Sequence, residues 1–456
     1  MSNPHQSDPS DPVVRTDPPV NDVLGIGFGP ANLALAIALE ERFPTARLRF
    51  LEAQPTPEWQ PGMLLDGSDI QNHPSRDLVT LRNPRSRYSF LNYLHEEGRL
   101  LQHLNLPAEY PLRKEYARYI RWAAGHFGHL VDCDARAARI TLTTVDGEQV
   151  YQVETTDGRR YLGRSLVVAP GRTPYLPEPF DRSDSRRVFH LTQYLFRLAE
   201  LTGEQEPRTV AVVGGSQSAV ELTLDLARRF PRAEVVNYVR SHSLRQKDTS
   251  PFSEEGYFPE FTRYYYEASR ESKKALDAYM HPTNYSSADG DVLRELYMLI
   301  HEQRLDGEQR VFVRGNRQAT AVREEDGRVV MELRELHTGA VERAEADLVV
   351  LATGFRNMGP GLHEELYPPL LDEVVHRFVF EEDGRLHVDA DYALRPRPDA
   401  GELPPLFISG LCEATHGIGD AGSFSLLSLR AATLLDALAA RVDLGLVETP
   451  VPATTG

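Results

Sequence analysis

Two glycine turns, each placed between a short apolar run and a helix-forming run, constrain the fold of this chain more than any other feature. The first, GIGFGPAN from Gly25 to Asn32, precedes an Ala/Leu-rich segment. The second, GGSQSA from Gly214 to Ala219, follows the apolar run Thr209–Val213. A buried strand, a glycine turn and a helix in this order are typical of nucleotide-binding units. The sequence therefore predicts an α/β fold with two doubly wound, Rossmann-like domains.

Each turn is followed by a second apolar run of strand character, which supports the same unit. These runs are Arg47–Leu51 and Glu234–Val239. Two further segments, Ser165–Gly171 and Ala346–Phe355, repeat the pattern of a buried strand that closes into a glycine turn. Ser423–Ala440 has the composition and length of a long helix. Strands that alternate with helices in this way predict parallel sheets.

The residue that ends the second strand predicts which nucleotide each unit binds. Glu52 ends it in the first unit, where an acidic side chain suits the ribose hydroxyls of an adenine dinucleotide. Arg240 ends it in the second unit, with Arg245 nearby, and a cation there suits the 2′-phosphate of NADP. Pro30 replaces a third glycine, and proline suits a first helical turn. FAD and NADPH are therefore predicted. The simpler interpretations are that the first glycine turn only packs a helix on a strand, and that Arg240 is a solvated surface charge.

Charge and composition exclude several classes of function. The net charge of -17 argues against nucleic acid and anionic membranes as partners, because both attract basic surfaces. No apolar run reaches the roughly 18 residues of a spanning helix, and the N-terminus has no signal pattern, so we expect a cytoplasmic protein. Cys133 and Cys412 form no CxxC pair. The histidines show no metal-ligand spacing, so no metal is expected, and His73, His190 and His416 receive no role.

Beyond the two turns, a series of short motifs resembles one known family. Over about residues 21–440 the chain is similar to the flavin-dependent N-hydroxylating monooxygenases, which include the ornithine and lysine N-hydroxylases of siderophore biosynthesis. The motifs, all in the family's order, are Gly25 to Leu33, Trp59 with Gly62 to Leu64, Asp77 to Pro84, Gly214 to Ala219, Thr283 to Ser286, Ala352 to Phe355, and His416 and Gly417 ahead of Leu426 to Ser428.

The resemblance implies that the cofactors carry out the oxidation. NADPH would reduce FAD, O2 would add at the flavin C4a atom, and the neutral amine of a small substrate would attack the distal oxygen of the C4a-hydroperoxyflavin. The protein would bind, orient and exclude water, so no catalytic side chain is predicted. Gln71 would support the flavin and the substrate, and Gln217 the nicotinamide. The family also implies a homo-oligomer.

The site residues follow from the motifs and from the resemblance. The predicted cofactor-binding residues are Gly25, Gly27, Gly29, Pro30, Asn32, Glu52, Trp59, Gln71, Gly214, Gly215, Ser216, Gln217, Ser218, Arg240, Arg245, Thr353 and Gly354. The predicted substrate-binding residues are Arg76, Lys247, Glu254, Arg263, Asn284 and Ser428. For Asn284, the preference of asparagine for turns offers a structural alternative.

The substrate-binding set departs from the family at its charged positions. Arg76 stands where ornithine hydroxylases commonly have a lysine that holds the substrate carboxylate, and arginine pairs with carboxylates through a planar fork. Glu254 replaces an asparagine, while Lys247 and Arg263 add positive charge. The added cations predict an acidic amino acid, such as L-aspartate, as the substrate, with oxidation that could continue to a nitro product.

Two alternatives remain open. If Glu254 binds an ammonium group, the substrate is L-ornithine, L-lysine or a diamine, as in siderophore biosynthesis. The second alternative is not an enzyme but a non-catalytic nucleotide-binding sensor. The presence of two complete nucleotide motifs and an altered substrate pocket argues against it.

The order of the motifs predicts that the NADPH domain is inserted in the FAD domain, with a small helical substrate region. The expected parts are a disordered tail over 1–20, the first part of the FAD domain over 21–185, the NADPH domain with the substrate-region helices over 186–335, the second part of the FAD domain with a substrate-lining helix over 336–442, and a tail over 443–456.

Overall fold

The computed structural model describes residues 18–203, 206–361, 363–420 and 422–445. The predicted tails, 1–20 and 443–456, fall mostly outside these residues. Their inner ends are packed, however, because Val20 pairs with Leu162 in a strand and Leu444 is buried in the core. The packed part of the chain therefore begins before Asn21 and extends past Val442.

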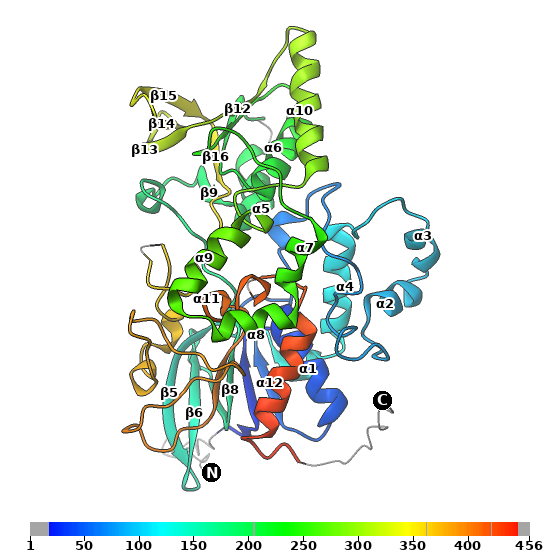
Figure 1. The fold of residues 1–456 in the computed structure, drawn as a ribbon, viewed down its shortest axis with the longest axis vertical. Helices are drawn as coiled ribbons and strands as arrows, with labels where there is room; N and C mark the ends of the chain where they lie inside the picture. The colour runs from blue at the N-terminus through cyan, green and yellow to red at the C-terminus, as the bar shows by residue number, and fades with distance from the viewer. Residues whose placement is uncertain (1–17, 204–205, 362, 421, 446–456) are drawn as a thin grey trace, which may run out of the picture.

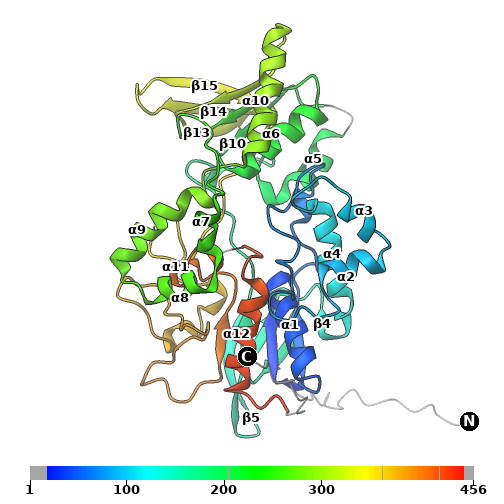
Figure 2. The ribbon, with the colours of Figure 1, turned by 45° about the vertical axis from the view of Figure 1, so that its right-hand side comes forward.

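The lower body in Figure 1 is built on a five-stranded sheet in which all neighbours are parallel. Two helices from opposite ends of the chain, α1 (Pro30–Arg42) and α12 (Leu427–Ala439), lie side by side against it (Figures 1 and 2). In sheet order the strands are β17 (Leu406–Ile408), β8 (Leu166–Val168), β2 (Val23–Ile26), β3 (Leu48–Leu51) and β4 (Val131–Asp132). The strands and helices expected here are confirmed, with ends that differ by a few residues.

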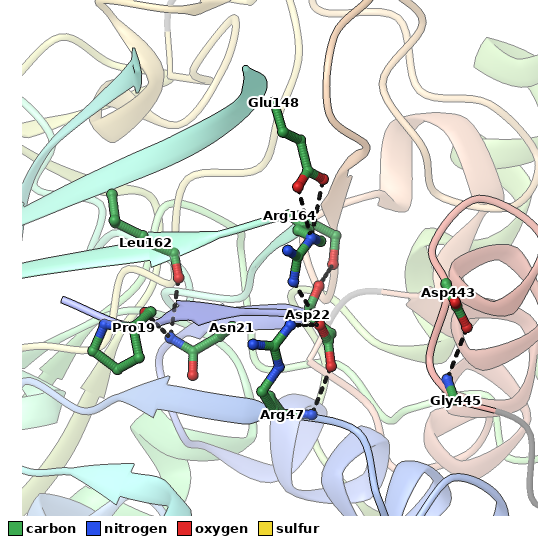
Figure 3. Close-up of polar contacts among 10 residues, drawn as sticks. Pro19, Asn21, Asp22, Arg47, Glu148, Leu162, Arg164, Asp443 and Gly445 are labelled. Atoms are coloured by element: carbon green, nitrogen blue, oxygen red, sulfur yellow. Dashed lines mark hydrogen bonds and ion pairs between the residues drawn. The ribbon is translucent and has the colours of Figure 1, made fainter. Parts of the chain in front are cut away.

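A four-stranded sheet completes the lower body. Asp22, which lies between β1 and β2, ties this sheet to the parallel one (Figure 3). Its carboxylate accepts hydrogen bonds from Arg47 N at 2.8 Å and from Arg164 Nη1 at 3.0 Å, and Arg164 also pairs with Glu148. In sheet order the strands are β1 (Val20–Asn21), β7 (Arg160–Gly163), β6 (Glu148–Thr155) and β5 (Ala137–Val145).

The upper body is built on a second parallel sheet, which carries the second glycine turn. In sheet order its strands are β12 (Val311–Arg314), β11 (Glu234–Tyr238), β10 (Thr209–Val213), β16 (Leu348–Leu351) and β9 (Val188–His190). A separate antiparallel sheet, β13 (Arg317–Glu325), β14 (Arg328–Glu335) and β15 (Val341–Ala346), packs on it through buried apolar side chains. Both nucleotide sheets are thus of the predicted parallel α/β type.

The division of the chain between the two bodies differs from the expected one. We expected the chain to return to the first domain at about residue 336, with the strand near Ala346–Phe355 belonging to that domain. Instead, β16 pairs in parallel with β10 in the second sheet, where Val210 lies opposite Leu348. The chain rejoins the core of the first body after β16, where Met358 and then Leu371 pack into it, and β17 later joins the first sheet. The prediction failed because a buried strand that ends in a glycine turn fits either sheet, and its sequence does not say which.

Helices cover the sheets and lie between the two bodies (Figure 2). In chain order they are α2 (Phe90–Glu96), α3 (Leu100–Leu104), α4 (Arg113–Gly125), α5 (Tyr194–Thr202), α6 (Gln217–Arg229), α7 (Pro251–Glu254), α8 (Pro259–Glu267), α9 (Arg270–Met280), α10 (Gly290–Leu305) and α11 (Glu413–His416). The α7–α9 region belongs to the second unit by sequence, yet Tyr257 and Met280 pack against Ile418 of the first. None of the helices in the described part of the chain combines the length and apolar character of a membrane span.

Candidate nucleotide and amine site

A cavity of about 500 Å³ opens at the carboxyl ends of β2, β3, β8 and β17. This is the edge at which open parallel sheets bind nucleotides. Five of the predicted cofactor-binding residues line it: Gly27, Gly29, Pro30, Glu52 and Trp59. Its size is that of an ordinary small-molecule or cofactor site.

The first glycine turn is shaped for close backbone approach. Gly27 has φ +81°, and a Cβ atom there would lie 2.3 Å from the carbonyl oxygen of Ala169. A Cβ atom on Gly25 would collide with the Phe50 ring at 2.2 Å. Gly29, by contrast, has nothing within 4 Å of an added Cβ, so open space begins at the N-terminus of α1. That arrangement leaves the helix N–H groups free for an anionic ligand.

Glu52 connects the turn to the cavity. Its Oε2 accepts a hydrogen bond from Phe28 N at 2.8 Å, and its Oε1 accepts one from Gln54 N at 2.8 Å. Each carboxylate oxygen keeps a lone pair, which leaves capacity for the ribose hydroxyls predicted there. Asn32 supports the turn from behind, because its amide donates to Gly27 O at 2.7 Å.

The cavity also contains residues that sequence reasoning missed. Ser409 lines it with a buried Oγ that has no hydrogen-bond partner among the described residues, as expected where a polar ligand binds. Arg136, Arg172 and Arg430 also line it, and Arg136 and Arg172 bring positive charge, whereas Arg430 is paired with the buried Asp420. These groups come from four separate segments, so no motif could have found them. The glycine turn, the orphan hydroxyl and the arginines together fit the pyrophosphate and sugar of a flavin dinucleotide.

The second glycine turn lies at the carboxyl end of β10. Gly214 has φ +145°, and an added Cβ atom would lie 2.2 Å from Ala352 O. Ser216 is the N-cap of α6, and Gln217 begins that helix. The Gln217 side chain is held at both ends, because it donates to Glu221 Oε1 at 3.1 Å and accepts from Asp289 N at 2.8 Å.

The cations predicted for the 2′-phosphate lie on the surface near this turn. Arg240 and Arg245 are both exposed, and neither forms an ion pair with another described residue. Arg240 lies near enough to Tyr175 to oppose the rise in pKa that burial causes in that phenol. Thr353 donates to Tyr175 O at 2.5 Å, and Gly354 has φ +82°. Thr353 and Gly354 follow β16, the strand that pairs with β10, so they lie beside the turn at the same edge of the sheet.

Gln71 sits at the junction of the two bodies. Its backbone has φ +53°, and its N–H donates to Asp69 Oδ1 at 2.9 Å. Its side-chain Nε2 is buried and lacks a partner among the described residues, although Gln71 does not line the cavity. Burial, with smaller contributions from the charges of Glu221 and Asp289, raises the pKa of Asp69 to about 6, although the hydrogen bond from Gln71 N acts in the opposite direction.

Two predicted substrate residues of opposite charge meet each other. Arg76 Nη1 lies 3.8 Å from Glu254 Oε2 and donates to Ser425 Oγ at 3.3 Å. Burial raises the pKa of Glu254, while Lys247 and Arg76 act in the opposite direction. Lys247 Nζ in turn lies 3.9 Å from Asp289 Oδ1. Each of these two cations therefore faces an acid, which the sequence alone did not reveal.

The other predicted substrate residues are less closely grouped. Arg263 is 74% exposed and pairs with Glu260 at 3.3 Å, so the geometry gives no support to its predicted contact with substrate. Asn284 ends the turn that follows α9, at intermediate exposure. Ser428 is buried in α12 with an unpartnered Oγ among the described residues, while its neighbours Leu427 and Arg430 line the cavity. Ser428 itself does not line the cavity.

The three histidines left without a role occupy structural or exposed positions. His190 Nε2 lies 2.9 Å from Gly354 O, and burial lowers the pKa of His190 to about 4. The His416 ring stacks on Tyr392 at 4.2 Å, and His73 is exposed. Over the described ranges, no group of three His, Cys, Asp or Glu residues could hold a metal ion.

Comparisons with known proteins agree with this geometry. Residues 19–357 match a family described as L-lysine 6-monooxygenase/L-ornithine 5-monooxygenase. The L-ornithine N(5)-monooxygenase of Burkholderia cepacia is 37% identical over 410 residues, which cover 87% of this chain and 90% of that protein.

Solved structures are similar over the same span. The ornithine N-hydroxylase of Kutzneria sp. 744, with reduced FAD, NADP+ and L-ornithine, has a TM-score of 0.85 and 30% identity, covering 93% of this chain and 100% of that one. The FAD-bound cadaverine monooxygenase of Erwinia amylovora has a TM-score of 0.79 and 25% identity, covering 96% of this chain and 100% of that one.

Proposed function

Because the chain belongs to the family of L-lysine 6-monooxygenases and L-ornithine 5-monooxygenases, we propose that it hydroxylates the side-chain amine of a diamino acid such as L-ornithine or L-lysine, using FAD, NADPH and O2. The family shows that the chain is an N-monooxygenase. Its amine substrate has to be inferred from the geometry of its own site. Named relatives act on ornithine or cadaverine.

The choice of substrate rests on the ion pair between Arg76 and Glu254, whose Nη1 and Oε2 atoms lie 3.8 Å apart. A guanidinium pairs with a carboxylate and a carboxylate pairs with an ammonium, so the pair presents one partner for each end of an α-amino acid. In the absence of substrate the two side chains form a long ion pair, which balances their charges. A zwitterionic head group can separate them without leaving either charge unpaired, whereas a diamine would leave Arg76 without a partner.

The two nucleotide turns would hold the cofactors. FAD would lie in the cavity against Gly27, Gly29 and Glu52, and NADPH against the turn at Gly214 with its 2′-phosphate near Arg240. Bound there, FAD and NADPH supply the reducing equivalents and the oxygen chemistry. The protein contributes the walls that exclude water and the charged pair that orients the amine.

The prediction of an acidic substrate such as L-aspartate loses its basis. It rested on a surplus of cations, but Arg76 faces Glu254, Lys247 faces Asp289 and Arg263 lies on the surface beside Glu260. Two carboxylates on one substrate would therefore meet no excess positive charge. The alternative that gave Glu254 the role of an ammonium partner fits this arrangement better.

The test is a comparison of amines with purified protein, FAD and NADPH. Amine-dependent NADPH oxidation is measured with L-ornithine, L-lysine, putrescine, cadaverine and L-aspartate, for the native protein and for Arg76→Met. We expect kcat/KM for one of the diamino acids to exceed that of the matching diamine. Arg76→Met should lower the diamino-acid value by roughly tenfold to a hundredfold, the worth of a charge-assisted hydrogen bond, and leave the diamine value nearly unchanged.

Other outcomes would revise the proposal. If Arg76→Met lowers kcat/KM equally for ornithine and putrescine, the arginine is structural and binds no substrate carboxylate. Turnover of L-aspartate without turnover of any diamino acid would restore the acidic-substrate interpretation. If the protein binds both nucleotides but none of the amines stimulates NADPH oxidation, the result would favour a non-catalytic nucleotide-binding sensor.

A further inference from the structure

Glu413, a carboxylate that none of the predicted roles uses, lies where three segments of the site meet. It begins α11, three residues after the cavity-lining Gly410. Its Oε2 accepts hydrogen bonds from the Tyr285 hydroxyl at 2.5 Å and from Asn357 Nδ2 at 2.9 Å. Tyr285 directly follows Asn284, the residue predicted to bind substrate, and Asn357 follows the Thr353–Phe355 turn.

The contacts of Glu413 continue to the cavity wall. Asn357 Oδ1 accepts a hydrogen bond from Arg172 Nη1 at 3.5 Å. The Arg172 guanidinium lies over the Phe355 ring at 4.7 Å, and both residues line the cavity. A continuous set of polar contacts therefore runs from Tyr285 through Glu413 and Asn357 to the flavin cavity.

Burial is the main reason that the pKa of Glu413 is raised, because the charges around it act in both directions. Burial raises the pKa of Glu413 to about 7, and Asp277 and Asp420 add to the rise, while the Tyr285 hydrogen bond and Arg172 oppose it. Tyr257 and Tyr265 also face this carboxylate, since its charge contributes to the raised pKa of each phenol. Glu413 therefore changes its charge near neutral pH.

We propose that Glu413, as a carboxylate, is a positioning residue that ties the Asn284–Tyr285 segment to the flavin cavity and so holds the substrate amine in place. The role of Glu413 in holding the amine rests on the proposed function, but the tether between Glu413 and Tyr285 does not. A carboxylate accepts hydrogen bonds roughly twice as strongly as a neutral carboxyl group. The tether is consequently firm above the pKa of Glu413 and weak below it.

The tether is tested first by hydrogen–deuterium exchange of a peptide that spans residues 281–289, in holoenzyme at pH 8. Glu413→Gln and Tyr285→Phe should each speed exchange, and the double variant should go no further than the faster single one. The matched control is Tyr194→Phe, which removes a similar bond from a tyrosine hydroxyl to Asp225 at 2.5 Å in the second unit and should leave exchange of this peptide unchanged. Unchanged exchange in both single variants, or effects that add in the double variant, would overturn the tether.

The role in substrate binding is tested by the pH dependence of KM for the best amine. In the native protein KM should fall by roughly threefold to tenfold between pH 6 and pH 8, the worth of strengthening one hydrogen bond. Glu413→Gln should keep the high KM at every pH, with unchanged FAD affinity. A native-like pH profile in Glu413→Gln would overturn this role. If no amine is turned over, the proposed function fails while the exchange result still decides the tether.

Discussion

Arg113 on α4 and Glu221 on α6 form a two-pronged ion pair between the lower and upper bodies, with Nη1 to Oε2 at 2.9 Å and Nη2 to Oε1 at 3.0 Å. Their side chains are only 9% and 5% exposed. Glu221 Oε1 also accepts from Gln217, the residue expected beside the nicotinamide. One buried carboxylate therefore joins the two nucleotide units and fixes a side chain of the second site.

Loss of Arg113 should destabilise the protein strongly. Arg113→Met leaves the buried charge of Glu221 without a cationic partner, which should lower the free energy of unfolding by about 3–5 kcal/mol in urea titrations. The surface control is Arg186→Met, because Arg186 and Glu200 are 70% and 49% exposed and such pairs contribute about 0–1 kcal/mol. Native-like stability of Arg113→Met would contradict a junction held by this pair.

The glycine turn at the flavin cavity offers a second prediction, which separates folding from binding. Gly27→Ala should lower the melting temperature and weaken FAD binding, since a Cβ atom 2.3 Å from Ala169 O at φ +81° forces the backbone to move. Gly29→Ala should keep the melting temperature of the cofactor-free protein, because nothing lies within 4 Å of its added Cβ. It should still weaken FAD binding, as its methyl group enters the space assigned to the pyrophosphate. Tight FAD binding by both variants would place the cofactor elsewhere.

These turns show what the sequence could predict. Gly27, Glu52 and Gly214 lie at fixed spacings within strand–turn–helix units, so local pattern alone positions them correctly. The nucleotide sheets and the long C-terminal helix follow from the same periodicity.

The remaining features of the site depend on contacts between distant segments. The partners of Arg76 and Lys247 are Glu254 and Asp289, and a count of charges along the chain could not distinguish a paired cation from a surplus one. The assignment of β16 to the second sheet failed for a related reason, since strand pairing is a long-range choice. The sequence could not assign a role to Glu413, because its partners Tyr285 and Asn357 come from distant segments of the chain.

Coenzyme preference gives a third prediction. Arg240→Ala should raise KM for NADPH by roughly tenfold and leave KM for NADH nearly unchanged, because only NADPH carries the 2′-phosphate that this cation is proposed to meet. Arg232→Ala is the control, since Arg232 precedes the same strand, β11, and is 86% exposed. An equal change for NADH and NADPH would remove Arg240 from phosphate recognition.

The raised pKa of Glu413 gives a fourth prediction, on stability. Its pKa is about 7 in the folded protein against an ordinary 4.5, so between these pH values the folded state binds the extra proton. Stability from this group is therefore present at about pH 4.5 and is lost as the pH rises through 7. Glu413→Gln removes that loss, so its stability relative to the native protein should increase from pH 5.5 to pH 8 by on the order of 1 kcal/mol.

Thermal unfolding at the two pH values measures this difference. The comparison with the native protein cancels the titration of groups that do not interact with Glu413. A stability difference that stays constant, or that falls as the pH rises, would contradict the raised pKa.

The most direct test of the central claim is to locate the oxygen in the product. Protein, FAD, NADPH and O2 are incubated with the preferred diamino acid, and fragment ions of the product identify the nitrogen that has gained oxygen. With Arg76 and Glu254 holding the α-carboxylate and α-ammonium groups, the account predicts one added oxygen on the side-chain nitrogen and none on the α-nitrogen. Oxygen on the α-nitrogen would mean that the substrate binds in the opposite direction and would contradict the account.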